Sequence, residues 1–158
     1  AGGLLYILMH GIAKAGLFLC AGIIEQGTNT KDITKMGGLV KGMPITAFSF
    51  LICAFSVMGV PPFGGFFSKY MVFMGALQNK QFAVSAFVLF GAFFTIIYSF
   101  RVFNMVFLGD VKIEAKEKDA GMVASVFSLA VLSLLGGLFI MYPAKFAAIA
   151  AMQMMGLK

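Results

Sequence analysis

Four ionisable side chains lie inside long apolar runs of this sequence: His10, Lys14, Lys69 and Arg101. A charged group is unfavourable within a lipid bilayer, so each of them is a candidate for moving a proton or an ion. His10 and Lys14 are four residues apart, which places them on one face of a helix, with Tyr6 one turn earlier. Side chains spaced in this way can pass a proton through intervening water, so they are predicted to form a proton relay.

Lys69 follows the segment "GVPPFGGFFSKY", which runs from Gly59 to Tyr70. Two prolines remove backbone donors, and the glycines permit dihedral angles that a helix forbids. The segment therefore predicts a broken helix. Freed carbonyls and water beside the break can solvate an ammonium group, which allows Lys69 to lose and regain its proton.

No acidic residue lies within an apolar run, because all six fall in or next to loops. The lysines at 14 and 69 are therefore expected to be neutral or hydrated, or to take counter-charges from another chain. Structural alternatives remain open for each residue. His10 can be satisfied locally, Lys14 can pair with a neighbouring subunit, and Lys69 and Arg101 can extend to the membrane surface.

The composition indicates an integral membrane chain. Apolar residues make up 61% of the 158 positions and charged residues 11%, with a mean hydropathy of +0.98. The net charge of +6 does not indicate nucleic-acid binding, because the basic residues stand singly in short loops. Two cysteines in apolar runs argue against a disulfide framework or a cysteine-ligated cluster, and one histidine excludes a bis-histidine haem from this chain alone.

Crossing a bilayer takes about 20 apolar residues of helix. Four segments qualify, at roughly 2–24, 44–78, 82–108 and 121–142, and 144–158 is expected to form an interfacial helical tail. As one straight helix, 44–78 would reach about 52 Å, well beyond the hydrocarbon thickness. We therefore expect an all-α membrane protein with about four transmembrane helices, the second broken at Gly59–Gly65. A hairpin that turns at the prolines is the alternative.

Lysines are distributed unevenly between the two ends of these spans. If each segment crosses once, loops 25–43 and 109–120 share a side with seven basic residues against three. The positive-inside rule then predicts that both loops lie on the cytoplasmic or matrix side. The hairpin alternative weakens the difference to six against four.

The stretch "LMHGIAKAGLFLCAG" and the block "MGGLVKGMPITAFSFLICAFSVMGVPPFGGFFSKYMVF" carry a family resemblance. They resemble the antiporter-like membrane subunits shared by respiratory complex I, multisubunit sodium/proton antiporters and energy-converting membrane-bound hydrogenases. The shared motifs are H-x-x-x-K-x-x-L-F, then G-G-L and M-P-x-T, then G-x-P-P-F-x-G-F-x-S-K. They cover roughly residues 4–75, whereas the last two spans are similar in hydropathy and spacing.

The resemblance implies a bundle of about fourteen helices with two inverted repeats, each with a broken helix, of which this chain is similar to the last four. It implies that Lys69 is the terminal proton donor, with Lys14 and His10 as the central relay. The glutamate and lysine pair of the first half-channel has no counterpart here, so another chain or segment is expected to supply it. The start at Ala1, inside an apolar run, also suggests the later part of a longer protein.

The expected function is proton translocation by a lysine, histidine and water relay, as part of a redox-driven complex of the NADH-quinone oxidoreductase or energy-converting hydrogenase type. The chain itself is expected to be a non-redox subunit without a cofactor or metal, one membrane domain over 1–158, with other membrane subunits as partners. Its membrane would be a bacterial or archaeal cytoplasmic membrane or an organellar inner membrane. A sodium/proton antiporter subunit and a purely structural membrane module are the alternatives.

Overall fold

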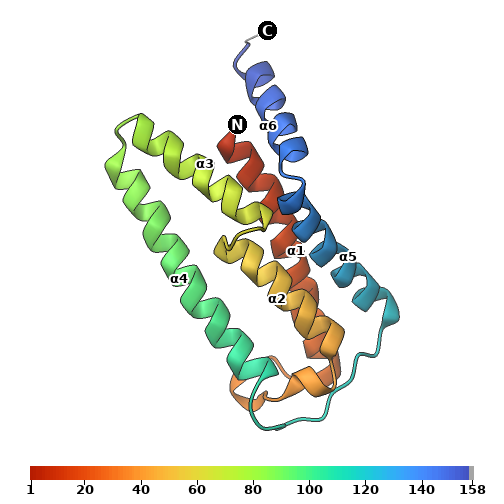
Figure 1. Ribbon diagram of the computed structural model, residues 1–158. Helices are drawn as coiled ribbons and strands as arrows, with labels where there is room; N and C mark the ends of the chain where they lie inside the picture. The colour runs from red at the N-terminus through yellow and green to blue at the C-terminus, as the bar shows by residue number, and fades with distance from the viewer. Residues whose placement is uncertain (157–158) are drawn as a thin grey trace.

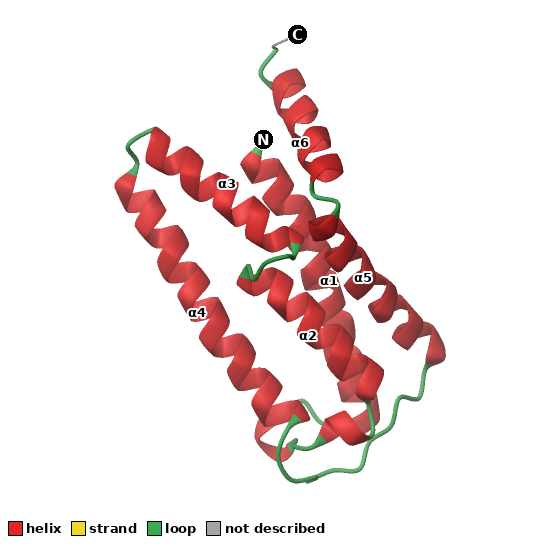
Figure 2. Cartoon of the chain, in the orientation of Figure 1, coloured by secondary structure: helices red, strands yellow, loops and turns green. Residues whose placement is uncertain are grey.

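The computed structural model describes residues 1–156, which form six α-helices and two short 3₁₀ helices joined by loops (Figures 1 and 2). No strand occurs within these residues, and this confirms the all-α expectation. The helices are α1 (Gly2–Thr28), η1 (Ile33–Lys35), η2 (Leu39–Lys41), α2 (Pro44–Met58), α3 (Gly64–Gln78), α4 (Phe82–Phe107), α5 (Ala120–Leu138) and α6 (Met141–Met154).

Three of the described helices, α1, α4 and α5, are long and apolar enough to cross a membrane, and α2 is a shorter apolar helix. Figure 1 shows α2 and α3 following one another along the bundle beside α4. The pair therefore crosses the bundle once, as a broken helix. The arrangement excludes the hairpin alternative and confirms the expected fold.

The break itself is narrower than predicted. It covers 59–63, whereas Gly64 and Gly65 already belong to α3. Helix α2 ends at Met58 and is capped by Gly59, which has a left-handed φ of 85° and donates its N–H to the carbonyls of Phe55 and Ser56. A glycine adopts this conformation without strain, so the end of α2 is encoded locally.

Two other helix boundaries differ from the sequence expectation. Helix α1 continues to Thr28 instead of ending near residue 24, because the Thr28 hydroxyl donates to the Ile24 carbonyl at 2.8 Å and Asn29 provides a left-handed cap. Helix α5 ends at Leu138, and α6 begins at Met141 rather than at 144 and contains Pro143. Pro143 is the third residue of α6, where the backbone N–H has no partner within the helix.

Helix α6 extends beyond the rest of the bundle, past the N-terminal end of α1 (Figure 1). Its first part stays attached, because Ala147 is buried in a small apolar cluster with Leu5 and Met9 of α1. The interfacial position of this tail stays a prediction, and the last two residues of the predicted tail lie outside the described range.

Helix α1 lies at the centre and contacts α2, α3, α5 and α6. The main apolar cluster joins α1, α2, α4 and α5 through residues such as Cys20, Phe50, Phe107 and Val126. Large side chains stay exposed along α4, which carries Phe82, Phe87, Phe90, Phe93 and Phe94 at its surface. An apolar surface of this extent is expected for a helix that faces lipid or further membrane helices.

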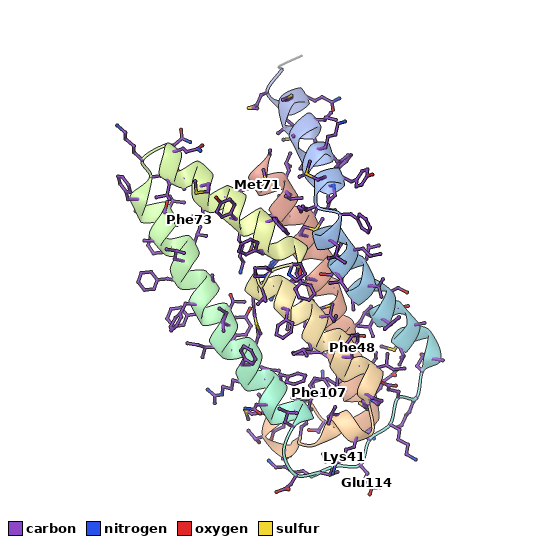
Figure 3. All side chains as sticks on the ribbon, in the orientation of Figure 1. Lys41, Phe48, Met71, Phe73, Phe107 and Glu114 are labelled. Carbon is purple, nitrogen blue, oxygen red and sulfur yellow. The ribbon has the colours of Figure 1, made fainter. Side chains whose placement is uncertain are left out.

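Both long connections lie at the same end of the bundle, where Figure 3 places Lys41 and Glu114. Backbone and side-chain hydrogen bonds join them: Gly38 N–H donates to the Leu108 carbonyl at 2.9 Å, and the Lys112 ammonium donates to the Thr34 carbonyl at 2.9 Å. The loops over 25–43 and 109–120 therefore share one side, which we call the loop end.

Candidate functional site

Lys69 reaches back across the helix break. Its Nζ donates to the carbonyl oxygens of Val57, at 2.6 Å, and Met58, at 3.2 Å, in the last turn of α2. In a continuous helix these carbonyls would accept from the N–H groups four residues later, which are Pro61 and Pro62. Proline has no N–H, so Lys69 supplies the two missing donors.

Glycines make this approach possible. A Cβ at Gly65 would overlap the Ser56 carbonyl oxygen, and a Cβ at Gly59 would lie 3.1 Å from Cδ of Lys69. The start of α3 therefore lies directly against the end of α2, within reach of the lysine side chain. The carbonyl end of α2 is also the negative end of its dipole, which favours a cation there.

Helices α1 and α5 enclose the break from two other directions. A Cβ at Gly137 of α5 would overlap the Pro62 carbonyl oxygen and press on the backbone of Gly64. A Cβ at Gly64 would in turn overlap the sulfur of Met9 of α1. Non-helical backbone at membrane depth is stable where protein shields it from lipid, and this packing provides the shield.

A pocket of about 300 Å³ lies beside Lys69, between α1, α3 and α4. Its polar lining residues are Tyr6, Lys69 and Thr95, one from each helix. The remaining lining is apolar or glycine and comes from α3 and α4: Val72, Phe87, Val88, Gly91 and Ala92. The pocket is large enough for several water molecules next to the ammonium group.

The predicted face of α1 carries a line of half-buried polar side chains. The rings of Tyr6 and His10 stack at 5.0 Å between centroids with an interplanar angle of 26°. Lys14, one turn further along, has its Nζ 6.0 Å from the ring centroid of Tyr98 in α4. Tyr6 and Lys69 therefore share the pocket, His10 lies on Tyr6, and Lys14 faces α4.

Within residues 1–156, no direct hydrogen bond joins Lys14, His10 and Lys69, so proton transfer between them needs water. The ion pairs of this range lie on the loop-end surface, between Lys31 and Glu25 at 3.4 Å and between Lys35 and Asp32 at 3.8 Å. Arg101 is exposed on α4 and does not line the pocket. Arg101 therefore does not belong to the cluster of polar residues around Lys69.

Sequence reasoning missed the contribution of α4. Thr95 lines the pocket and Tyr98 faces Lys14, although both were treated as part of an apolar span. The signal was present, because Thr95 and Tyr98 are hydroxyl residues three apart in a long apolar run and thus lie on one helix face.

A helical bundle with a broken helix, and with an ionisable side chain at the break, is an arrangement also found in membrane transport proteins built on discontinuous helices. Residues 1–95 match the family described as "NADH:quinone oxidoreductase/Mrp antiporter, TM". The chain belongs to this family of antiporter-like integral membrane subunits.

Several curated proteins are similar over most of this chain. An Na(+)/H(+) antiporter subunit of Alkalihalophilus pseudofirmus is 40% identical over 112 residues, which are 71% of this chain and 23% of that protein. An NADH-quinone oxidoreductase subunit of Campylobacter jejuni is 34% identical over 139 residues, 86% of this chain and 23% of that protein. The chain thus spans about a quarter of the length of these relatives.

Solved structures share the fold. A chain of the Mrp complex from Dietzia sp. DQ12-45-1b superposes with a TM-score of 0.89 at 23% identity, over 96% of this chain and 37% of that one. A chain of the membrane-bound sulfane sulfur reductase, an archaeal respiratory membrane complex, gives a TM-score of 0.75 at 26% identity, over 87% of this chain and 24% of that one.

Proposed function

We propose that this chain is the part of an antiporter-like subunit that moves protons across the membrane, with Lys69 as the group that takes up and releases the proton. The observation that carries the proposal is the pair of hydrogen bonds from Lys69 Nζ to the carbonyls of Val57 and Met58. They hold an ionisable amine at a helix break, beside a pocket that can contain water.

The hydrogen-bond count suits a group that changes its protonation state. An ammonium has three N–H donors, and a neutral amine has two N–H donors and a lone pair. Two donors are used by the carbonyls, so the third proton of Lys69 is free to leave toward the pocket. The break keeps its two hydrogen bonds in both states.

We further propose that protons enter from the loop end and pass along Lys14, His10 and intervening waters to Lys69, and that they leave at the opposite face. The excess of lysines at the loop end favours a cytoplasmic or matrix position for it. In this proposal, residues 1–158 form one membrane domain of a longer protein in a redox-driven complex. Other membrane subunits or segments supply the first half-channel.

The test compares two replacements, one at Lys69 and one at a control lysine, in the assembled complex reconstituted in vesicles with a pH-sensitive dye inside. Lys69→Arg keeps a cationic donor for the carbonyls but cannot release its proton at working pH. We expect it to abolish proton transport while the complex still assembles. Lys145→Arg on the exposed face of α6 is the matched control and should transport normally. Undiminished transport by Lys69→Arg would refute the proposal.

Sodium/proton antiport is the second candidate, because relatives at 40% and 38% identity are Na(+)/H(+) antiporter subunits. A cation would then use the same polar region, although the apolar runs contain no carboxylate ligand. Transport that depends on a sodium gradient and needs no electron donor would favour antiport. Transport driven by electron transfer in sodium-free buffer would favour the redox-driven complex.

A further inference from the structure

Three fully buried hydroxyls have no hydrogen-bond partner among residues 1–156. They belong to Ser49 and Ser56 of α2 and Ser133 of α5, with exposed fractions of 0%, 1% and 1%. A buried polar group without a partner is unfavourable, and buried hydroxyls nearly always bind protein or ordered water. The interface of α2 with its neighbours therefore contains unused hydrogen-bonding capacity.

Two of these hydroxyls, those of Ser49 and Ser56, belong to a buried stripe along one face of α2. Thr46, Ser49, Cys53 and Ser56 follow at spacings of three, four and three residues, which is a helical stripe, and all four are buried. The stripe faces α1, because a Cβ at Gly16 would lie 2.5 Å from the Cys53 sulfur. From Thr46 to Ser56 it extends for about 15 Å along the helix.

The lower end of the stripe reaches the loop end. The Glu117 carboxylate oxygen Oε1 accepts hydrogen bonds from the Thr46 backbone N–H at 2.7 Å and from the Thr46 hydroxyl at 2.9 Å. Glu117 is half-buried in the connection before α5. The stripe therefore begins at an ionisable group next to solvent.

The upper end of the stripe reaches the helix break. Ser56 directly precedes Val57, whose carbonyl binds Lys69, and its own carbonyl lies against Gly65. Ser133 lies one turn before Gly137, which packs on the backbone of Pro62 and Gly64. The stripe on α2 thus ends beside the carbonyl that binds Lys69, and Ser133 lies on α5 one turn from the contact of that helix with the break.

We propose that this hydroxyl file, made of Thr46, Ser49, Ser56 and Ser133, holds a chain of water molecules and forms a second proton route from Glu117 to Lys69. The route is separate from the α1 face that carries Lys14 and His10. It rests on the proposed function, because Lys69 is its acceptor. Glu117 takes a proton from solvent and passes it on, each hydroxyl accepts a proton from one neighbour and gives its own to the next, and Lys69, as the neutral amine, accepts the last one. The hydroxyls and waters are left turned round and rotate back before the next transfer.

The first experiment detects the water without reference to transport. Hydroxyl radicals produced from water by a short X-ray pulse oxidise side chains next to bound water, and Cys53 lies between Ser49 and Ser56. In the assembled complex we expect Cys53 to be oxidised despite its complete burial, with the exposed Met154 as the internal reference. A Cys53 that stays unmodified would overturn the proposal, whatever the transport activity.

The second experiment uses two replacements of equal shape. Ser49→Thr keeps a hydroxyl and adds a methyl group, whereas Ser49→Val has the same outline without a hydroxyl, so both disturb packing alike. We expect Ser49→Val to reduce Cys53 oxidation and to slow proton transport at least tenfold relative to Ser49→Thr. Ser128→Val is the control, because Ser128 is exposed on α5 and donates to its own helix.

The outcomes separate this route from the function on which it rests. Equal transport by Ser49→Val and Ser49→Thr, with transport abolished in Lys69→Arg, would refute the hydroxyl file and leave the role of Lys69 intact. Normal transport by Lys69→Arg would refute the proposed function, even if Cys53 were oxidised.

Discussion

The Nζ of Lys69 lies 2.6 Å from the Val57 carbonyl oxygen, in place of a hydrogen bond that Pro61 cannot make. The same nitrogen lies 3.2 Å from the Met58 carbonyl, which faces the equivalent loss at Pro62. One side chain therefore supplies both hydrogen bonds that the prolines cannot make. Lys69 caps the end of α2 and is also the candidate proton carrier.

Because Lys69 caps α2, replacing it is expected to affect stability as well as transport, and two different replacements should separate these effects. Lys69→Met leaves two buried carbonyls without donors, which should lower the free energy of unfolding by about 1–3 kcal/mol. Lys69→Arg keeps donors at this position and should retain most of the stability. Thermal unfolding in detergent would measure both, and equal stability of Lys69→Met and the wild type would contradict the capping role.

Gly65 is predicted to tolerate no side chain. A Cβ there would overlap the Ser56 carbonyl, which is backbone and cannot move aside, so Gly65→Ala should destabilise by about 1–3 kcal/mol. Gly75 in the same helix has open space around its Cβ position. Gly75→Ala should therefore stabilise by about 0.5–1 kcal/mol through helix propensity. Denaturation curves of the two variants should shift in opposite directions.

Neighbouring glycines of α5 provide a second matched pair. Gly137→Ala would press on the backbone of Pro62 and Gly64, whereas Gly136→Ala meets only the flexible end of Met9, at 3.1 Å. We expect Gly137→Ala to destabilise the bundle and to displace the break, and Gly136→Ala to be tolerated. Proton transport and thermal unfolding of the two variants, measured side by side, test whether the contact of Gly137 with the break is required. Equal behaviour of the two variants would contradict this.

Glu117 is predicted to cap α2 from a distant part of the chain. Its carboxylate binds the Thr46 N–H in the first turn, where a negative charge is favourable. Glu117→Ala should lower the free energy of unfolding by about 1–2 kcal/mol. The exposed Glu114 is the control, and Glu114→Ala should have little effect on the same melting curve. Equal effects of both changes would argue against the cap.

The stability of the loop end is expected to depend on pH through the Asp32 carboxylate. Hydrogen bonds from the Thr34 hydroxyl and then the Thr34 backbone hold the pKa of the Asp32 carboxyl below its ordinary value. Its contribution to stability is thus present above the ordinary pKa, about 3.9, and is lost as the pH falls through the lowered one. Thr34→Val removes the hydroxyl at similar volume and should raise the pKa of Asp32. Carboxyl carbon NMR shifts over an acid titration would show it.

Much of the architecture follows from local chemistry. Long apolar runs predict membrane helices, and the pairing of Pro61 with Pro62 predicts the break, because a proline disrupts the interior of a helix. The four-residue spacing of His10 and Lys14 places them on one helix face, and this follows from the regular geometry of the helix alone. The ends of α1 at Thr28 and of α5 at Leu138 differ from the predicted spans by a few residues, because hydrogen bonds at helix ends, such as that from the Thr28 hydroxyl to the Ile24 carbonyl, are not visible in hydropathy.

The sequence alone therefore determined the helical membrane class, the approximate position of the break and which ionisable residues lie within the apolar runs. Only the tertiary structure decided what those residues contact, because packing brings together groups that are far apart in the chain. Lys69 meets a carbonyl twelve residues earlier, and Glu117 meets a residue 71 positions earlier. No periodicity in the sequence encodes either contact, since each joins segments that only the packing of the whole bundle brings together.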